Sequence, residues 1–414
     1  MKLTDIETFA VKNPSPGIGG TYWVFLKLTT DDGITGYGEV YGVQYGPMVT
    51  CRMIEDTFAR YLVDESPFDT EMHTRRIYSA GFSGRPDLSI GGILSGLEMA
   101  CWDIVGKALD QPVYNLLGGK VHERLRSYTY LYPENVDSLY PAEIDASVYE
   151  DPDTAAEMAA RYVSQGFTAV KFDPVGPYAV IGGYMASVPK MELSATFCQR
   201  IREAVGDQAD LLFGTHGQMT TASAIRLAGL LEPYLPLWFE EPCPPDGFDS
   251  FARVVEATSI PVATGERLTS KYDFKRALDA GVAILQPDLG RSGGILESKK
   301  IAALAEAYNA QIAPHLYCGP FAALANIQLA TCSPNFLIQE SMQTFKGMYA
   351  ELLSNPIEWQ DGYILPPLAP GLGADLNEDV ARAHACDDAP GQRLQLEMHQ
   401  SAEIDLRSSN RNNG

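Results

Sequence analysis

The sequence is short of positive charge. Its 414 residues include 31 Lys and Arg against 53 Asp and Glu, which gives a formal net charge of -22 and an isoelectric point near 4.6. Nucleic acids and anionic membranes bind proteins through a surplus of Lys and Arg, so neither is an expected partner. An anionic substrate would need a local cationic cluster or a metal ion to hold it.

The sequence also lacks any uncharged apolar run approaching the roughly 18 residues that suggest a membrane span. The N-terminal stretch MKLTDIETFAV has no apolar segment of the kind found in secretion signals. We therefore expect a cytoplasmic protein.

Paired cysteines are absent as well. The seven cysteines, at positions 51, 101, 198, 243, 318, 332 and 386, are scattered and never form a CxxC arrangement. This spacing favours neither a disulfide framework nor a thiolate metal site. Cys318 lies three residues after His315, which would suit a nucleophilic Cys/His pair, but a cysteine is more often simply buried.

Residues 1–124 predict a small α+β domain. The run TYWVFLKLTT, the turn DDG and the run ITGYGEV predict a β-hairpin, because Asp-Gly suits a tight reversal. A helix is expected over SGLEMACWDIVGKALD, where apolar residues recur every three or four positions. The glycines of LLGG are typical of the end of a helical piece.

Residues 125–345 predict a parallel sheet, because eight short apolar pieces alternate there with amphipathic helical stretches. The pieces are RSYTYLY, FTAVKFD, ADLLFG, LPLWFEE, IPVATGE, VAILQPD, AQIAPHL and NFLIQES. Polar residues at their ends recur about every 25 residues, the length of one strand and one helix. Eight such units predict a (β/α)8 TIM-type barrel, with functional side chains at the C-terminal strand ends. A doubly wound open sheet is the alternative, but it would gather its polar residues at one switch point.

Two further segments lie outside this regular pattern. The step from Asp173 to His216 contains PVGPYAVIGGYMASVPKM, whose Gly and Pro content is typical of a loop over an active site. Residues 346–385 are expected to pack back on the N-terminal domain, and residues 386–414 to form a polar tail.

The strand ends contain the residues expected to carry the chemistry. Glu240 and Glu266 end two successive strands, and hard oxygen ligands of this kind suit Mg²⁺. Asp288 and His315 end two later strands. A carboxylate bonded to one ring nitrogen raises the basicity of the other, as a general base requires. Surface carboxylates at loop starts and a structural histidine capped by a neighbouring Asp are the plain alternatives.

The ordered motifs resemble those of the enolase superfamily, in its mandelate racemase-like branch, over residues 1 to about 380. They are SGLEMACWDIVGKAL, LLGGKV, WFEEP, VATGERL, AILQPDLGRSGGI, IAPHLYCGP and APGLGADLNED. A histidine just beyond the third strand together with APH on the seventh is similar to the sugar-acid dehydratases, galactonate dehydratase among them. The resemblance implies a barrel lidded by the N-terminal capping domain, and abstraction of the proton α to a carboxylate, with Mg²⁺ stabilising the enediolate.

The resemblance also implies roles for individual residues. The expected catalytic residues are His315 and Asp288 as the base pair, His216 as the acid that protonates the leaving hydroxyl, Lys171, and Glu340 as a hydrogen-bonding partner of the substrate. Residues near strand ends that could bind hydroxyls or a carboxylate are Arg267, Gln218, Tyr317 and Tyr178. The segments 14–20 and 41–47 fit lid loops that select the substrate, or plain surface loops.

Two positions depart from the family pattern. Asp173 replaces the second lysine of the KxK motif that begins at Lys171, which counts against a racemase acting through a Lys/His pair. Gly214 stands where a metal-binding carboxylate usually ends the third strand. We expect Asp173, on the neighbouring strand, to replace it in a site of Asp173, Glu240 and Glu266. His216 as the third ligand, or water in its place, are the alternatives.

The expected function is that of a Mg²⁺-dependent hydro-lyase acting on an acid sugar, an aldonate or aldarate, to give a 2-keto-3-deoxy sugar acid. Racemisation or epimerisation and lactone cycloisomerisation share the enolate step and stay open. A non-catalytic barrel that binds sugar acids also stays open because of Gly214, although the other expected site residues are all present. The resemblance makes a homo-oligomer plausible.

Overall fold

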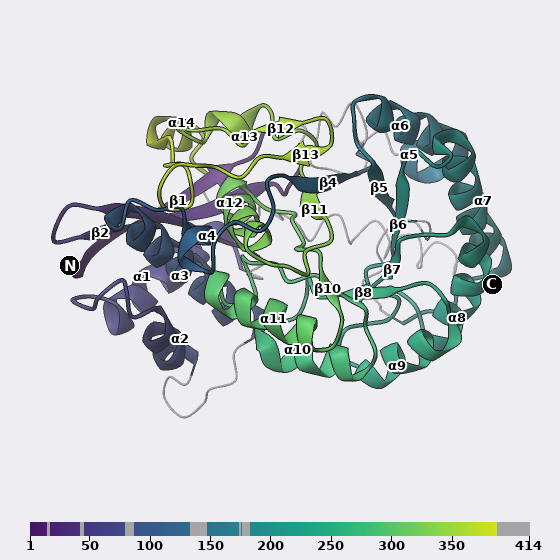
Figure 1. Cartoon of the computed structure of the whole chain (residues 1–414), viewed down its shortest axis with the longest axis horizontal. Helices are drawn as coiled ribbons and strands as arrows, with labels where there is room; N and C mark the ends of the chain where they lie inside the picture. Colours follow the sequence, from purple (N-terminus) through teal and green to yellow (C-terminus); the bar gives the residue numbers. More distant parts are fainter. Residues whose placement is uncertain are drawn as a thin grey trace, which may run out of the picture.

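The computed structural model describes residues 1–14, 17–41, 45–78, 87–132, 147–173, 175 and 183–386. Figure 1 shows two parts side by side, an N-terminal sheet with its helices and a ring of strands surrounded by helices. Tyr178, the rest of the predicted loop over residues 176–182, and the tail from residue 387 lie outside the described residues.

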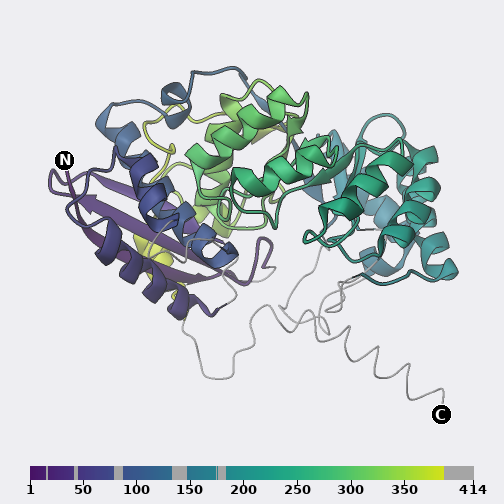
Figure 2. The same ribbon diagram turned by 90° about the horizontal axis from the view of Figure 1, so that it is seen from below.

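The capping domain is built on an antiparallel sheet of β1 (Leu3–Lys12), β2 (Tyr22–Thr30) and β3 (Thr35–Val40), in that order. The predicted hairpin is confirmed, because β2 pairs with β3 across the DDG turn. The helices α1 (Pro47–Tyr61), α2 (Thr70–Tyr78) and α3 (Leu88–Ala108) accompany this sheet. Figure 2 shows them together on one side of it.

Helix α3 is the central helix of the capping domain. Asp87 caps its first turn by accepting from the backbone N–H groups of Ser89 and Ile90. A Cβ atom at Gly38 of β3 would lie 2.0 Å from a carbonyl oxygen of α3, so only glycine permits this close approach of strand and helix. Among the described residues, α3 alone is long and apolar enough to cross a membrane, but 78% of its apolar window is buried inside the protein. It is therefore a core helix.

The second part is a closed barrel of eight parallel strands. They are β4 (Leu125–Tyr130), β5 (Ala169–Phe172), β6 (Asp210–Gly214), β7 (Trp238–Glu240), β8 (Val262–Thr264), β9 (Ile284–Leu285), β10 (Gln311–Ile312) and β11 (Gln339–Ser341). Strands β4 to β10 pair in sequence order, β11 pairs with β4, and Leu337 N–H donates to the carbonyl of Ile312 to close the ring. All eight predicted strands are present.

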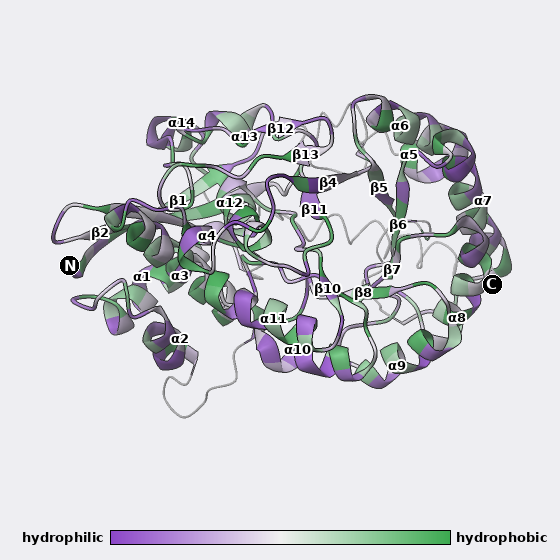
Figure 3. Ribbon diagram, viewed as in Figure 1, coloured by the Kyte–Doolittle hydropathy of each residue, from purple (hydrophilic) through white to green (hydrophobic). Residues whose placement is uncertain are grey.

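Helices surround the barrel, as Figure 1 shows. They are α6 (Pro152–Ser164), α7 (Val188–Val205), α8 (Thr221–Leu231), α9 (Phe248–Ala257), α10 (Ser270–Asp279), α11 (Ile295–Ala307) and α12 (Pro320–Thr331), with the short pieces α4 (Val113–Leu116), α5 (Ser147–Glu150) and η2 (Glu232–Tyr234). Hydrophobic and hydrophilic stretches alternate along these helices (Figure 3), as expected when one face packs on the sheet. A cluster of buried side chains from the strands and their immediate neighbours packs in the barrel, from Tyr128 of β4 and Trp238 of β7 to Ile338 just before β11.

The predicted loop after β5 is shorter than the sequence suggested. Its last residues, from Val188 to Met191, form the first turn of α7. Ser187 accepts a hydrogen bond from the backbone N–H of Lys190, and Pro189 lies in the first turn, where a missing N–H costs nothing. Pro189, one of the prolines that suggested a loop, therefore marks the start of a helix.

The C-terminal segment contacts both parts of the protein. The hairpin of β12 (Trp359–Gln360) and β13 (Tyr363–Ile364) extends the barrel sheet, because β13 pairs antiparallel with β4. After α13 (Met348–Glu351) and α14 (Glu378–Ala383), the chain returns to the capping domain, where Ala385 bridges to Val11 of β1. The segment 346–385 therefore contacts the barrel as well as the capping domain, and the domain boundaries stay a prediction.

Candidate active site

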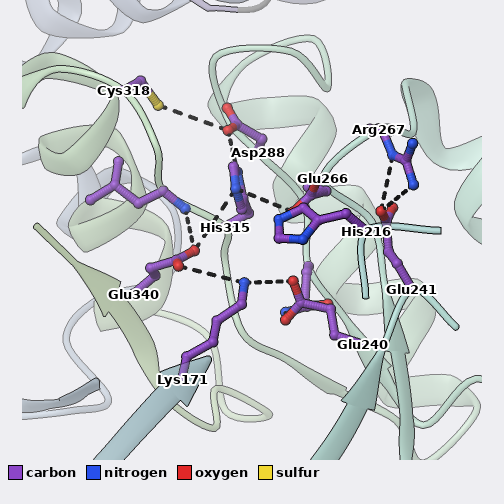
Figure 4. Close-up of polar contacts among 12 residues, drawn as sticks. Lys171, His216, Glu240, Glu241, Glu266, Arg267, Asp288, His315, Cys318 and Glu340 are labelled. Carbon is purple, nitrogen blue, oxygen red and sulfur yellow. Dashed lines mark hydrogen bonds and ion pairs between the residues drawn. The ribbon is translucent and has the colours of Figure 1, made fainter. Parts of the chain in front are cut away.

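Most of the predicted site residues meet at the C-terminal ends of the barrel strands. Figure 4 shows Lys171, Glu240, Glu266, Asp288, His315, Glu340 and His216 directed toward one region. The register explains this meeting, because Gly214 of β6 lies opposite Glu240 of β7, and Phe172 of β5 lies opposite Phe213 of β6. Side chains that end neighbouring strands therefore stand at the same level of the barrel.

His315 and Asp288 form a buried pair. Nδ1 of His315 lies 2.7 Å from Oδ2 of Asp288, and the other carboxylate oxygen accepts from the backbone N–H of Gly290 at 2.8 Å. With Nδ1 bonded to the aspartate, Nε2 is the nitrogen that can exchange a proton, and it lies 3.3 Å from Oε2 of Glu266. Burial alone would lower the pKa of His315, but the charge of Glu266 and the bond to Asp288 outweigh it and raise the pKa to about 9.

The backbone around His315 is also held in place. Asn326 of α12 donates to the carbonyl of His315 at 2.9 Å, and Glu340 of β11 accepts from the N–H of Leu316 at 2.9 Å. The ring of Tyr41, at the start of the second predicted lid loop, stacks on the imidazole with ring centroids 6.3 Å apart. The base candidate thus has fixed contacts on its backbone and on its ring.

His216 and Asp173 form a second pair. Nδ1 of His216 lies 2.6 Å from Oδ2 of Asp173. His216 and the following Gly217 both have positive φ angles, 47° and 68°, so the chain turns sharply just beyond β6. Burial alone would lower the pKa of His216, but the charges of Asp173 and Glu266 outweigh burial and raise the pKa to about 9.

Gly214 is explained by this second pair. A Cβ atom at position 214 would lie 2.5 Å from Oδ1 of Asp173, so a larger residue there would require the aspartate side chain to move. The carboxylate of Asp173 therefore stands where a side chain at position 214 would begin. The expectation that Asp173 replaces the missing third-strand carboxylate as a metal ligand stays a prediction.

Lys171 lies at the centre of the carboxylates and is almost fully buried. Its Nζ lies 2.5 Å from Oε1 of Glu240 and 3.6 Å from Oε1 of Glu340. Burial would lower the pKa of Lys171, but the charges of Glu240 and Glu340 hold it well above its ordinary value. The second oxygen of Glu240 accepts from Nε2 of Gln286 at 2.6 Å, so both oxygens of that carboxylate are bonded.

The carboxylates suit a divalent cation in their chemistry. Asp173, Glu240 and Glu266 offer hard oxygen atoms, and the buried Oε2 of Glu266 has no hydrogen-bond partner in the structure. Within the described ranges, however, no three His, Cys, Asp or Glu side chains are already gathered so that they could hold a metal ion. The oxygen donors of Asp173, Glu240 and Glu266 fit Mg²⁺ in their chemistry. In this structure the carboxylate of Glu240 is bonded to Lys171 and Gln286 instead.

The predicted substrate-binding residues are less closely grouped. Nε and Nη2 of Arg267 donate to the buried carboxylate of Glu241, at 2.9 and 2.5 Å. Gln218 is buried and its backbone carbonyl accepts from Gly183 and Tyr184. Tyr317 is partly exposed on the His315 loop. Their roles toward a substrate stay predictions, as does that of Tyr178, which lies outside the described residues.

The sequence reading missed Gln286 and Glu241. Gln286 lies two residues before Asp288, so it shares the inward parity of the strand end, which could have revealed it. Glu241 follows Glu240 directly in WFEEP, and its positive φ of 40° turns its carboxylate toward Arg267. Cys318 is buried and burial raises the pKa of its thiol well above its usual value, which disfavours the nucleophilic Cys/His pair.

The TIM-type barrel, its α+β cap and the carboxylates and histidines at its strand ends define a class of enzyme. Residues 153–380 match the family described as enolase C-terminal domain-like, and residues 15–118 match the mandelate racemase / muconate lactonizing enzyme N-terminal domain. The chain belongs to the enolase superfamily, in its mandelate racemase-like branch. The expected fold class and family are both confirmed.

Individual relatives narrow this class. D-galactonate dehydratase from Ralstonia pickettii is 34% identical over 412 residues, which cover 98% of this chain and 99% of the relative. D-galactonate dehydratase from Ralstonia nicotianae is 36% identical over 386 residues, covering 91% and 93%. A solved mandelate racemase/muconate lactonizing enzyme from Labrenzia alexandrii DFL-11 has a TM-score of 0.90 and 59% identity, covering 94% and 98%. The expectation of a hydro-lyase of this superfamily is confirmed, and members of this kind use Mg²⁺.

Proposed function

We propose that this enzyme is a Mg²⁺-dependent dehydratase of an acid sugar, with His315 as the base and His216 as the acid. The observation that carries the proposal is the pair of histidines, each with Nδ1 against an aspartate carboxylate: His315 is hydrogen-bonded to Asp288 at 2.7 Å, and Nδ1 of His216 lies 2.6 Å from Oδ2 of Asp173. In each pair the aspartate faces Nδ1, which leaves Nε2 to exchange a proton. Dehydration needs two such groups, one to take a proton and one to deliver a proton.

The reaction follows from these two groups. Nε2 of His315 takes the proton from the carbon α to the substrate carboxylate, and the electron pair of that C–H bond forms a C=C bond. The bond from the β-carbon to its hydroxyl then breaks as His216 protonates the departing oxygen, and water leaves. The resulting enol takes up a proton at the β-carbon, loses the proton of its enol hydroxyl, and becomes a 2-keto-3-deoxy acid.

Other residues orient the substrate in this proposal. Lys171 and Glu340 face each other at 3.6 Å. Lys171 would donate to an oxygen of the substrate carboxylate, and Glu340 would accept from a substrate hydroxyl. The burial of Lys171, Glu340 and His315 keeps water from the reacting carbon, which strengthens the electrostatic contacts there. Lys171 and Glu340 are both among the site residues that the sequence predicts.

Asp173, Glu240 and Glu266 would hold the Mg²⁺ ion. When bound, Mg²⁺ supplies positive charge that stabilises the enediolate and, beside Glu266, brings the pKa of His315 toward the range of a base. The support for Asp173 in this set is that its carboxylate fills the space beside Gly214.

The relatives named D-galactonate dehydratase favour an aldonate as the substrate. The test is a screen of aldonic and aldaric acids with Mg²⁺ for a 2-keto-3-deoxy product. Accumulation of an epimer or an opened lactone instead would identify one of the other enolate reactions. The absence of both product and α-proton exchange in D₂O, for every acid sugar, would overturn the proposal. A cytoplasmic location, an acid-sugar partner and a homo-oligomer remain predictions, as does the lack of nucleic-acid or membrane binding.

A further inference from the structure

One buried carboxylate of the capping domain reaches the barrel. Glu39 is the second-last residue of β3, and its side chain is fully buried. Its Oε1 accepts from the backbone N–H of Gly319 at 2.5 Å, and its Oε2 accepts from that of Ala322 at 2.9 Å. Gly319 precedes α12, whose first N–H groups have no partners within the helix. Glu39 therefore satisfies the start of a barrel helix from another domain.

The backbone before α12 lies directly against the capping domain. A Cβ atom at Gly319 would lie 2.8 Å from Oε1 of Glu39, 2.9 Å from Trp23 and 3.0 Å from Phe25. A Cβ atom at Gly19, in the first predicted lid loop, would lie 2.9 Å from the carbonyl oxygen of Cys318. The loop backbone is therefore closely packed against the capping domain at these two glycines.

This backbone is the continuation of the catalytic strand end. Residues 315–319 run from His315 to Gly319, and we refer to them as the base loop. On the barrel side, Asn326 and Glu340 hold the first two residues of the base loop, and Tyr349 donates to the carbonyl of Cys318 at 2.6 Å. On the capping side, Glu39 holds its last residue. The loop is thus fixed at both ends, by two different domains.

We propose that Glu39 is a positioning residue, which fixes the base loop through Gly319 and Ala322 and so sets the place of His315. The inference rests on the proposed role of His315 as the base. Both oxygens of Glu39 act as acceptors, and this holds for a carboxyl group in either protonation state. Glu39→Gln keeps the size of the side chain but turns one acceptor into an NH₂ donor, which then faces a backbone N–H.

Glu98 provides a matched control. It is a buried glutamate of the same domain, on α3, and it accepts from the backbone N–H groups of Ile295 and Leu296 at 2.7 and 2.9 Å. These residues begin α11, seven residues beyond Asp288, whereas Gly319 lies four residues beyond His315. Glu98→Gln therefore alters the same kind of helix cap between the same two domains. The capped residues, however, lie farther along the chain from the His315–Asp288 pair.

The kinetic test compares the two variants on the accepted acid sugar. We expect Glu39→Gln to lower kcat about tenfold, with little change in KM and a larger primary isotope effect for substrate deuterated at the α-carbon, because the base is misplaced. Glu98→Gln should keep kcat within about twofold of the wild type, a change of under half a kcal/mol in the barrier. Equal kcat values for the two variants would overturn the inference.

A second measurement does not require turnover. Hydrogen–deuterium exchange of the full chain should show faster exchange in peptides spanning residues 315–323 for Glu39→Gln than for Glu98→Gln. Unchanged exchange in these peptides would overturn the inference about Glu39, whether or not the enzyme turns over an acid sugar. A failure to turn over any acid sugar would instead refute the proposed function. If Glu39→Gln does not fold, Glu39→Asp draws both oxygens back by about 1.5 Å and should show the same changes. Wild-type exchange and kcat in Glu39→Asp would contradict the proposal.

Discussion

The two histidine–aspartate pairs of the barrel have similar distances from Nδ1 to the carboxylate, 2.7 and 2.6 Å, but different surroundings. The side chain of His315 is 6% exposed, and its loop is held by residues from the barrel and from the capping domain. The side chain of His216 is 20% exposed and follows a sharp turn with a positive φ.

This difference matches the two tasks of a dehydratase. A base that takes a proton from carbon has a high barrier and needs a dry, fixed position, because misplacement by about 1 Å costs a large factor in rate. An acid that protonates an oxygen has an easier reaction and can stand nearer to solvent. The comparison therefore supports His315 as the base and His216 as the acid, and the same substitution in each pair tests it.

His315→Asn should give the largest effect. Asparagine keeps a polar side chain of similar reach but cannot take the proton, so α-proton exchange and dehydration should both fall by about 10³ to 10⁴. Loss of the α-proton signal of the substrate in D₂O, followed by NMR, measures the exchange. Exchange at the wild-type rate in a folded variant would show that another group, such as Lys171, is the base.

His216→Asn should separate the two steps. Dehydration should fall by about 10² to 10³ because the leaving hydroxyl loses its acid, while α-proton exchange should continue because His315 is intact. The same NMR experiment measures exchange, and a colour reaction for 2-keto acids measures the product. If exchange were lost together with dehydration, the division of roles between the two pairs would be wrong.

The aspartates should differ in a further way. Asp288→Asn removes the acceptor of Nδ1 and should lower kcat by about 10² without changing Mg²⁺ affinity. Asp173→Asn should weaken Mg²⁺ binding at least tenfold, because a charged ligand becomes a neutral amide, and should also slow dehydration. Isothermal titration with Mg²⁺ measures the affinity of both variants. Equal affinities would remove Asp173 from the ligand set.

The sequence predicts the barrel well because its local patterns are strong. Each strand is a short apolar run and each of the key polar residues stands at its end, so Glu240, Glu266, Asp288 and His315 could be found without tertiary information. The fold class, the hairpin and the pairing of Asp288 with His315 follow from the same patterns. The start of α7 did not, because Gly and Pro are common both in loops and at helix N-termini.

Contacts between distant residues could not be read in this way. Gln286 meets Glu240 across 46 residues, and Glu39 meets Gly319 across 280. No local pattern marks either contact, since a glutamate at the end of a strand reads as a surface residue until the opposite domain is in place. The contact of Asp173 with His216 is likewise not marked by any local pattern, since the two residues end different strands 43 positions apart.

Cys318→Ala should give the smallest effect. It tests whether the His315–Asp288 pair keeps its position when one of the contacts to Asp288 is removed. Sγ of Cys318 lies 3.8 Å from Oδ2 of Asp288, a weak contact, while that aspartate also bonds to Nδ1 of His315 and to the backbone of Gly290. Loss of one weak donor among three should lower kcat less than about threefold, since a full neutral hydrogen bond contributes only about 1 kcal/mol. Steady-state kinetics beside a thermal melt would separate this change from a loss of packing. A fall of two orders of magnitude in a folded variant would mean that the thiol takes part in the chemistry, and that the tight hold on His315 is not what distinguishes the two pairs.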